Sequence, residues 1–300
     1  MDILGETRID FVGKRRITFV LSAALVLVGL LAAVQVGRGR ANLGIDFAGG
    51  VSMALRFEHP VSLEQARRVV RQSPFPDSEL LQFSEGNRLS IHIKTAREDL
   101  EPVSKAMVEA LRKGFPDNPF QVEGITTIGP TVGARLKLDA LKATIIALVL
   151  IVIYIAIRFE WKFGVAATIA TFHDVLAVLG IFYLLNKEIN LLIVTALLTL
   201  AGYSLTDTVV VFDRIRENLR LRAKQSLPDL VNRSINEVLR RTIVTTLTVI
   251  LVLIPIILYG GEVTHDFALA LLLGVIVGTY SSVYLASPLV VVWKTRERKV

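Results

Sequence analysis

An aspartate lies within a stretch of sequence that is apolar enough and long enough to cross a lipid bilayer. Asp207 belongs to the run 191–212, which otherwise consists of apolar and small polar residues. An ionised carboxylate at the centre of a bilayer costs roughly 2.5–3.5 kcal/mol, so such residues face a protein interior rather than lipid. Asp207 is therefore a candidate for a proton or ion site, with a polar contact between helices as the plainer alternative.

Two other apolar runs also carry polar groups. Arg241, Thr245 and Thr248 recur at intervals of four and three residues, and Thr242 and Thr246 at an interval of four, so these residues form a polar stripe along a helix. His173 and Asp174 lie near the middle of a different run. An alternative interpretation of Arg241 is an anchor whose side chain extends to the lipid headgroups. An alternative interpretation of Asp174 is a structural hydrogen bond to His173 or to a serine or threonine.

Small residues form a ridge in the last apolar run. Gly274, Gly278, Ser282 and Ala286 recur at intervals of four residues. Such a ridge lets another helix approach closely. We expect it to be a helix-packing surface, either within the chain or between chains.

The apolar runs that hold these residues predict a polytopic α-helical membrane protein. Hydrophobic residues make up 52% of the 300 residues, and runs of about 20 residues match the roughly 30 Å hydrocarbon core of a bilayer. Six predicted transmembrane helices cover residues 17–36, 138–157, 163–185, 191–212, 242–259 and 266–293. The first run is longer than the apolar part of a secretory signal peptide, so we interpret it as an uncleaved helix.

Basic residues are concentrated on one side of these predicted helices. The net charge is +7, and lysines and arginines gather in the N-terminal segment 1–16, the turn 158–162, the connector 213–241 and the tail 294–300. Six crossings put all four segments on the same face, which the positive-inside rule makes cytoplasmic. We therefore expect both termini inside, a connector of amphipathic helices on the membrane surface, and no nucleic-acid binding. The absence of cysteine excludes disulfides and thiolate metal ligands.

The polar segment 37–137, between the first two predicted helices, is long enough to form a separate domain, and the charge pattern places it outside the cytoplasm. Its pattern predicts strand 50–57, a helix capped by Ser62, hairpin strands 80–83 and 88–94 around a turn at Glu85, helix 98–113 and strand 120–128. The order βαββαβ is that of a small α+β ferredoxin-like fold, in which two helices cover one face of a sheet. Its two histidines, His59 and His92, lie far apart in sequence, so we expect exposed side chains and no metal site.

Several longer motifs resemble those of one family. They are Gly44-Ile-Asp-Phe-Ala-Gly-Gly50, Phe172-His-Asp-Val175, Tyr203-Ser-Leu-Thr-Asp-Thr-Val-Val-Val-Phe-Asp-Arg-Ile-Arg-Glu-Asn218, Arg233-Ser-Ile-Asn-Glu-Val-Leu-Arg-Arg-Thr242, Gly278-Thr-Tyr-Ser-Ser282 and Ala286-Ser-Pro288. Together they are similar to the SecF family, the smaller half of the bacterial SecDF protein-export membrane complex, in the resistance-nodulation-division superfamily. The resemblance runs from the first predicted helix to the end of the chain.

This resemblance implies an accessory subunit of the bacterial Sec preprotein translocase. It implies that the chain pairs with SecD in a heterodimer of twelve helices, which uses the proton motive force to promote late steps of protein export. The further partners implied are the SecYEG channel, SecA, YajC, YidC, the translocating preprotein and the lipid bilayer. The location implied is the bacterial cytoplasmic membrane, and no cofactor or hydrolytic activity is implied.

The resemblance also implies which residues form the proton pathway. The family's transmembrane carboxylate matches Asp207 and its essential arginine matches Arg241, while a second key aspartate belongs to SecD. Asp174 and His173 are further candidates. The commonest form of the motif has asparagine before the aspartate where this chain has Thr206, which leaves the local partner of Asp207 open; Thr206 is a further candidate for the proton pathway.

Two other functions fit parts of the sequence. A drug or lipid exporter of the same superfamily would have two large outer domains and twelve helices in one chain, whereas this chain has one small domain and six helices. An intramembrane aspartyl protease would let Asp174 and Asp207 share a proton and activate water, but the residues before Asp207 lack the Gly-x-Gly-Asp pattern. Proton and sodium coupling are both compatible with the sequence.

Overall fold

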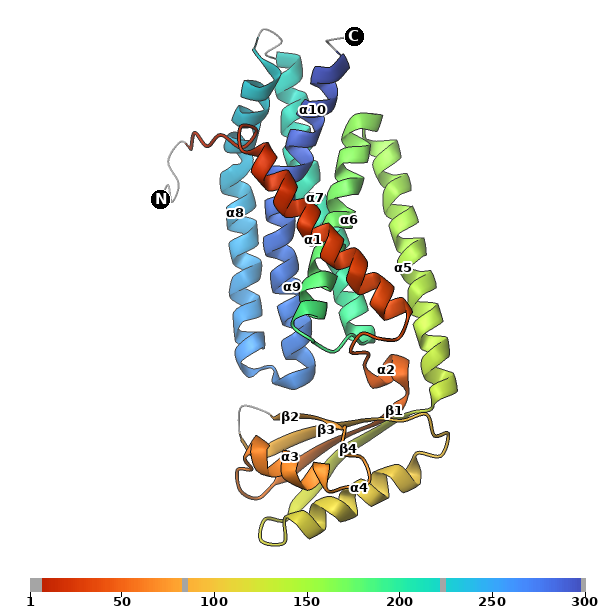
Figure 1. The fold of residues 1–300 in the computed structure, drawn as a ribbon. Helices are drawn as coiled ribbons and strands as arrows, with labels where there is room; N and C mark the ends of the chain where they lie inside the picture. The colour runs from red at the N-terminus through yellow and green to blue at the C-terminus, as the bar shows by residue number, and fades with distance from the viewer. Residues whose placement is uncertain (1–6, 83–85, 222–224, 298–300) are drawn as a thin grey trace.

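The computed structural model describes residues 7–82, 86–221 and 225–297. Long helices form an upright bundle, a small α+β domain lies below one end of it, and both ends of the described chain lie toward the opposite end (Figure 1). Lys224 of the predicted connector, Arg298 and Lys299 of the predicted tail and Glu85 of the predicted hairpin turn lie outside the described residues.

Within the described residues, six helices are long and apolar enough to cross a membrane, which confirms the predicted polytopic fold. They are α1 (Arg15–Gly37), α5 (Pro130–Arg158), α6 (Trp161–Leu184), α7 (Leu191–Leu221), α8 (Leu227–Tyr259) and the span Thr264–Trp293. The last span is formed by α9 (Gly261–Ser281), the π-helix η1 (Ser282–Ala286) and α10 (Ser287–Glu297).

Three of these helices extend beyond their apolar runs. α5 begins at Pro130 rather than at residue 138, α7 continues to Leu221, and α8 begins at Leu227. The described parts of the connector 213–241 are therefore continuous with α7 and α8 and do not form helices separate from them. Hydropathy marks where a helix leaves lipid, whereas the backbone hydrogen bonds continue as long as the sequence supports them.

The amphipathic pattern of the connector is explained by packing within the protein. Its apolar side chains, Ile215, Leu230, Val231, Ile235 and Leu239, are buried in one core cluster. On the polar side, Arg214 contacts Glu217 and Glu237 at 2.7 Å each. The Asn218 amide donates to Ser234 at 2.9 Å and to Glu237 at 2.7 Å. These contacts join the ends of α7 and α8 that lie far from the α+β domain.

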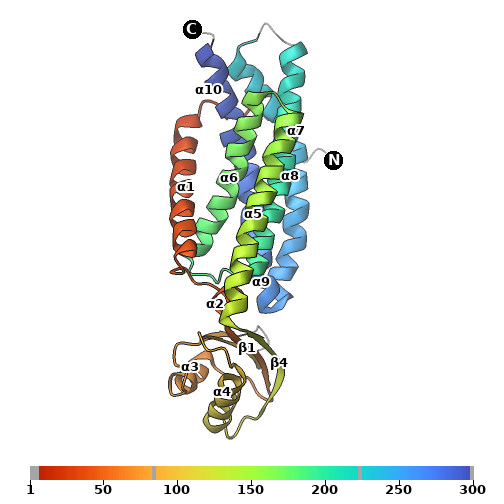
Figure 2. The ribbon, with the colours of Figure 1, turned by 90° about the vertical axis from the view of Figure 1, so that its right-hand side faces the viewer.

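The centre of the bundle is formed by α6, α7 and the last span. In the most apolar stretch of each helix, the buried share of the residues is 56% for α6, 44% for α7 and 50% for the last span. The corresponding share is only 11% for α5 and 11% for α8. The α5 and α8 helices therefore lie at the outside of the bundle (Figure 2). Helix α1 crosses α6 closely, because a Cβ atom on Gly29 would lie 2.2 Å from the carbonyl oxygen of Leu176.

The α+β domain has the predicted ferredoxin-like order. Strands β1 (Gly50–Phe57), β2 (Glu79–Gln82), β3 (Arg88–Lys94) and β4 (Phe120–Ile128) form an antiparallel sheet in the order β2-β3-β1-β4. Helices α3 (Leu63–Arg71) and α4 (Glu101–Gly114) cover the face that points away from the bundle (Figure 1). Ser62 caps α3 by accepting a hydrogen bond from Gln65 N–H, as predicted. The short helix α2 (Ile45–Ala48) was not predicted.

The domain core follows from the alternation of side chains along the strands. Val51, Met53, Leu55 and Phe57 of β1, with Leu89, Ile91 and Ile93 of β3, are buried against α3 and α4. The residues between them, including Ser52, Ser90 and His92, consequently point to the other face of the sheet. That face is turned toward the ends of the membrane helices (Figure 1).

Two consecutive glycines lie where the chain enters β1. Gly49 and Gly50 have φ values of 78° and 144°, which residues with a Cβ atom rarely adopt. A Cβ atom on Gly50 would lie 2.0 Å from the carbonyl oxygen of Ile93. Glycine is therefore required where the chain leaves α2 and enters the sheet.

Candidate functional site in the membrane helices

Asp207 lies at the contact between α7 and α8. Its Oδ1 atom accepts a hydrogen bond of 3.0 Å from the hydroxyl of Thr242. Its Oδ2 atom is buried and has no hydrogen-bond partner among the residues that the structure describes. Since an ionised carboxylate can accept several hydrogen bonds on each oxygen, Oδ2 can accept a proton or a hydrogen bond from a further donor.

Arg241 lies on the exposed side of α8, next to Thr242 in sequence. Within the described ranges no ion pair of 4 Å or less joins Arg241 to Asp207. The attraction between the two side chains therefore acts over a longer distance than a direct hydrogen bond.

Thr206 does not contact the Asp207 carboxylate. Its side chain is exposed, and its hydroxyl donates to the carbonyl oxygen of Gly202 in the preceding helical turn at 3.0 Å. The hydrogen-bonding partner of Asp207 is Thr242, which helical spacing alone placed on a polar stripe of another helix. Spacing within one helix does not reveal which residue of a neighbouring helix lies opposite.

Asp174 has a different environment, in the centre of the bundle. The side chains of Asp174 and His173 are 0% and 1% exposed, and His173 Nδ1 lies 2.8 Å from Asp174 Oδ1. Asp174 Oδ2 accepts a hydrogen bond of 2.8 Å from Ser281 and a second, short one from Ser204. Both oxygens of Asp174 are thus satisfied, while His173 Nε2 is buried without a hydrogen-bond partner in the described part of the chain.

The predicted small-residue ridge faces α7 of the same chain. Cβ atoms on Gly274 and Gly278 would lie 2.5 Å from Leu200 and 3.0 Å from Ser204. One turn further, the hydroxyls of Ser282 and Thr208 are 2.8 Å apart. Residues at intervals of four on both helices therefore interlock, which is the packing of two i±4 ridges.

The π-helix η1 lies beside both carboxylates. A π-helical turn displaces the residues that follow it from their α-helical positions, and such turns are frequent at functional sites. Here two consecutive residues point to different partners: Ser281 donates to Asp174, and Ser282 contacts Thr208, the residue after Asp207. The two acidic groups are consequently linked through neighbouring residues of a single helical turn.

Polar side chains on the outside of the bundle form two stripes. Exposed Thr195, Thr199 and Thr206 follow one face of α7, and exposed Arg241, Thr245 and Thr248 follow one face of α8. The two stripes flank the contact between Asp207 and Thr242. The threonine hydroxyls donate to carbonyl oxygens of their own helices, whereas the charge of Arg241 is costly in contact with lipid, so the face that carries Arg241 is suited to another membrane protein.

A second group of titratable side chains lies outside the bundle, and sequence reasoning did not identify it. Glu79, His92 and Glu188 bring potential ligand atoms within 4.8 Å of one another. His92 is not the exposed residue that we expected, because its side chain is only 15% exposed. Both oxygens of Glu79 already receive hydrogen bonds, from Asn42 at 2.8 Å and from Lys94 at 3.2 Å. The Lys94 ammonium group supplies a positive charge here, so the group forms part of a hydrogen-bonded ionic cluster.

Comparison with known protein families identifies two matching regions. Residues 107–296 match the model described as "Protein export membrane protein SecD/SecF, C-terminal". Residues 41–61, which include the glycine pair at the start of β1, match the "SecD/SecF GG Motif".

Similar proteins cover the whole chain. A protein translocase subunit SecF from Thermodesulfovibrio yellowstonii is 50% identical over 293 residues, which are 97% of this chain and 96% of that relative. A protein translocase subunit SecDF from Thermus thermophilus is 40% identical over 296 residues, which are 98% of this chain and 40% of that relative. The crystal structure of SecDF from Thermus thermophilus superimposes with a TM-score of 0.80 and 38% identity, covering 97% of this chain and 39% of that longer chain.

Proposed function

Because this chain belongs to the SecF family of protein translocase subunits and has a role in protein export, we propose that it couples proton movement to export through a change in the protonation of Asp207. The Asp207 carboxyl group carries the proposal. Its Oδ2 atom is buried without a hydrogen-bond partner among the described residues, and its Oδ1 atom is held by a hydroxyl of a different helix. A buried acceptor without a partner costs about 1–3 kcal/mol, so a proton or a helix movement that satisfies Oδ2 has a direct energetic effect.

The membrane potential supplies enough free energy for such coupling. One elementary charge that crosses the membrane gains about 2.3 kcal/mol per 100 mV. That amount changes a two-state helix equilibrium by more than about tenfold. Asp207 is suited to bias this equilibrium because it sits at the contact between α7 and α8. Arg241 acts on the carboxylate through its charge in this arrangement of helices and comes closer to it in another.

Asp174 and His173 have a supporting part in the proposal. The carboxylate of Asp174 has partners on both oxygens, which favours a permanent contact between α6, α7 and α9. The pair therefore holds the centre of the bundle together while Asp207 exchanges its proton.

The partner that we propose for the exposed polar stripes is SecD. In Thermus thermophilus a SecDF chain contains a region similar to this protein and is about two and a half times as long, which supports association with SecD and with the Sec translocon in general. We propose that SecD covers the polar faces of α7 and α8 and supplies the second key aspartate. SecYEG, SecA, YajC, YidC and the translocating preprotein are the further partners proposed.

The proposed orientation follows from the positions of the basic residues. The ends of α7 and α8 that carry Arg214 and Arg233 lie opposite the α+β domain (Figure 1). The positive-inside rule makes that end of a bundle cytoplasmic. We therefore propose that both termini are cytoplasmic, that the α+β domain is extracytoplasmic and that the membrane is the bacterial cytoplasmic membrane.

We also propose that the protein has no hydrolytic activity of its own. In an aspartyl protease two carboxyl groups share one proton at close range. Here Asp174 bonds to His173, Ser204 and Ser281, whereas Asp207 bonds to Thr242. Among the described residues no hydrogen bond joins the two carboxyl groups directly, which favours two separate roles.

The test is proton-driven export by vesicles that contain the chain together with SecD and the translocon. Asp207→Asn retains the size and the acceptor of the side chain but cannot bind and release a proton, so we expect the stimulation of export by the proton motive force to be lost. Asp213→Asn is the matched control, because Asp213 lies on the same helix and pairs with Arg158 at 2.8 Å. Unimpaired stimulation in Asp207→Asn overturns the proposal, and stimulation that requires sodium assigns a different coupling ion.

A further inference from the structure

The face of the sheet that points toward the bundle rests on the turn between α6 and α7. The backbone of residues 42–44 pairs with this turn in a short parallel bridge between Leu43 and Ile189. Ile189 N–H donates to the carbonyl oxygen of Asn42 at 2.8 Å, and Gly44 N–H donates to that of Ile189 at 2.9 Å. The domain is thus hydrogen-bonded to the turn as well as linked by the chain.

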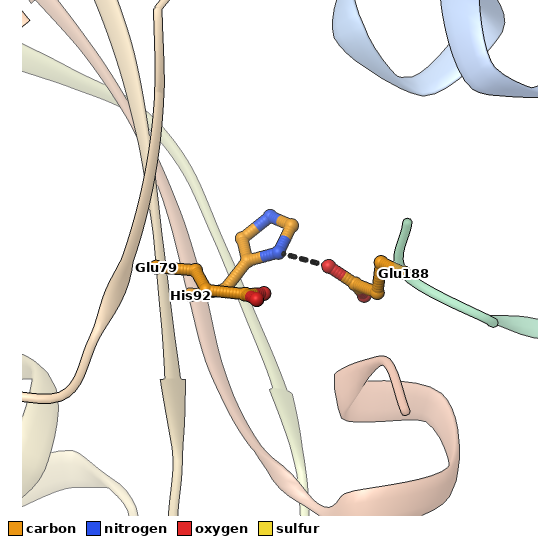
Figure 3. A group of neighbouring side chains, drawn as sticks. All are labelled: Glu79, His92 and Glu188. Atoms are coloured by element: carbon orange, nitrogen blue, oxygen red, sulfur yellow. Dashed lines mark hydrogen bonds and ion pairs between the residues drawn. The ribbon is translucent and has the colours of Figure 1, made fainter. Parts of the chain in front are cut away.

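Side chains strengthen the same junction. His92 Nδ1 of β3 lies 2.9 Å from Glu188 Oε2 of the turn, and the two side chains point toward each other across the gap between domain and bundle (Figure 3). The side chains are 15% and 12% exposed, so water screens the pair only in part. His92 Nε2 lies 3.2 Å from the Ser90 hydroxyl, which can donate to a neutral imidazole or accept from a protonated one.

Two further contacts fix the position of the turn. Asp46 of α2 accepts a hydrogen bond of 3.0 Å from Leu191 N–H, at the first residue of α7. A Cβ atom on Gly44 would lie 2.3 Å from Glu188 Oε1. Glu188 is therefore packed against the backbone that leads into the domain.

This turn connects the two helices that carry the buried acidic groups. Asp174 lies on α6, which ends before the turn, and Asp207 lies on α7, which begins after it. A shift of α7 relative to α6 changes the position of Glu188. The junction therefore connects the helices that carry the two membrane carboxylates to the sheet.

Several charged groups surround His92. Glu79 comes from β2, Lys94 from β3, Lys187 and Glu188 from the turn, His265 and Asp266 from α9, and Arg67 from α3. Most of them are already paired: Lys94 contacts Glu79, and Asp266 contacts both Lys187 and His265. Of the two imidazoles, His92 is the one that bridges the domain and the turn.

We propose that His92 and Glu188 form a proton-sensitive joint that positions the α+β domain on the ends of α6 and α7. The two residues act as positioning residues for export, and the joint responds to the proton concentration on the domain side of the membrane. The inference deepens the proposed function and rests on it for the link to export, but the joint itself is measurable in the isolated chain.

The direction of the response follows from the charges. An imidazole titrates near neutral pH. Below that pH, protonated His92 and ionised Glu188 form a charge-assisted hydrogen bond, which is stronger than a neutral one. As the pH rises through the titration of the imidazole, the positive charge is lost and the joint weakens. Acidification on the domain side therefore tightens the joint, and alkaline conditions release it.

The test is hydrogen exchange of the full chain in lipid nanodiscs at about pH 5.5 and about pH 8, which bracket the titration of imidazole. The readout is the protection of the peptide that contains the Ile189 and Leu191 amides, corrected for the intrinsic effect of pH on exchange. We expect protection to be about fivefold higher at the lower pH, because a charged hydrogen bond replaces a neutral one. His92→Gln and Glu188→Gln should each abolish this difference.

The matched control is His59→Gln, which removes the other histidine of the domain and should leave the pH response unchanged. Equal protection of the wild-type chain at both pH values overturns the proposal. So does a response that persists in His92→Gln or that disappears in His265→Gln. Chelators should have no effect, since a requirement for a metal ion contradicts a joint made by protonation alone.

The same measurement separates this joint from the role of Asp207. We expect Asp207→Asn to retain the pH-dependent protection of Ile189 while it loses proton-driven export. If Asp207→Asn exports normally, the proposed function fails and the joint still stands. If the protection does not depend on pH, the joint fails and the assignment of Asp207 is unaffected.

Discussion

Thr242 on α8 donates a hydrogen bond of 3.0 Å to Asp207 on α7, so the carboxylate is held by the neighbour of Arg241 and not by Arg241 itself. This contact is one of the direct links between α7 and α8, together with the contacts of Arg214 and Asn218 near the ends of these helices. A change in the protonation of Asp207 therefore acts directly on the contact between α7 and α8.

Replacement of Thr242 tests this contact. Thr242→Val keeps the shape of the side chain and removes the hydroxyl that donates to Asp207 Oδ1, which costs about 1–3 kcal/mol. We expect proton-driven export in vesicles with SecD to fall and its pH profile to shift. Thr245→Val is the control, because the Thr245 hydroxyl donates to backbone carbonyls of its own helix. Equal effects of the two variants would contradict a specific role of Thr242.

Loss of a hydroxyl next to Asp174 should act on stability. Ser281→Ala removes one of the donors to a carboxylate that is completely buried, and the expected loss is about 1–3 kcal/mol in the free energy of unfolding. Thermal unfolding of the isolated chain in detergent measures it. Ser287→Ala is the comparison, because the Ser287 hydroxyl contacts a carbonyl oxygen of its own helical segment. A smaller loss in Ser281→Ala than in Ser287→Ala would count against the role of Asp174 in holding the bundle.

The contact between α7 and α9 predicts the effect of a larger residue at Gly278. Gly278→Val places new methyl groups against Ser204, which lies 3.0 Å from the position of a Cβ atom, and overpacking of this kind costs about 1–3 kcal/mol. The free energy of unfolding of the isolated chain in detergent is the measurement. Gly202→Val should change it little, since nothing lies within 4 Å of a Cβ atom at Gly202.

The glycine pair at the start of β1 gives a prediction for the α+β domain. Gly50→Ala combines a positive φ with a collision against the Ile93 carbonyl, and we expect a loss of about 3 kcal/mol or more. Hydrogen exchange of the β1 and β3 amides should increase accordingly. Gly124→Ala on β4 is the control, because a Cβ atom there meets no other atom within 4 Å. Unchanged exchange in Gly50→Ala would show that the backbone of the junction can rearrange.

The N-terminal segment before α1 should detach from α8 in acid. A hydrogen bond from the Gly13 N–H and another from Asn232 hold the pKa of Asp10 below its usual value. A carboxyl group whose pKa is lowered by folding contributes stability above its unfolded pKa of about 4, and this contribution is lost as the pH falls through the lowered pKa. Hydrogen exchange of the Phe11 and Val12 amides, which donate to Asn232 Oδ1, should increase in acid. Asp10→Asn should remove this dependence on pH.

Local features of the sequence determined most of the fold. Six apolar runs gave six helices, because the thickness of a bilayer sets the length of an apolar segment. Period-two alternation and the cap at Ser62 gave the ferredoxin-like order, because both depend on residues close together in the chain. The ends of α7 and α8 were missed because hydropathy reports lipid contact and not helix length.

The tertiary structure alone decided which side chains meet. Helical spacing put Asp207 and Thr242 on polar stripes of their own helices, but the rotation of one helix against the next decided that they face each other. His92 and Glu188 are 96 residues apart, and no local pattern relates a strand to a turn between two membrane helices. Spacing along the chain fixes the face of an element on which a residue lies, whereas the packing of that face against another element depends on the whole core.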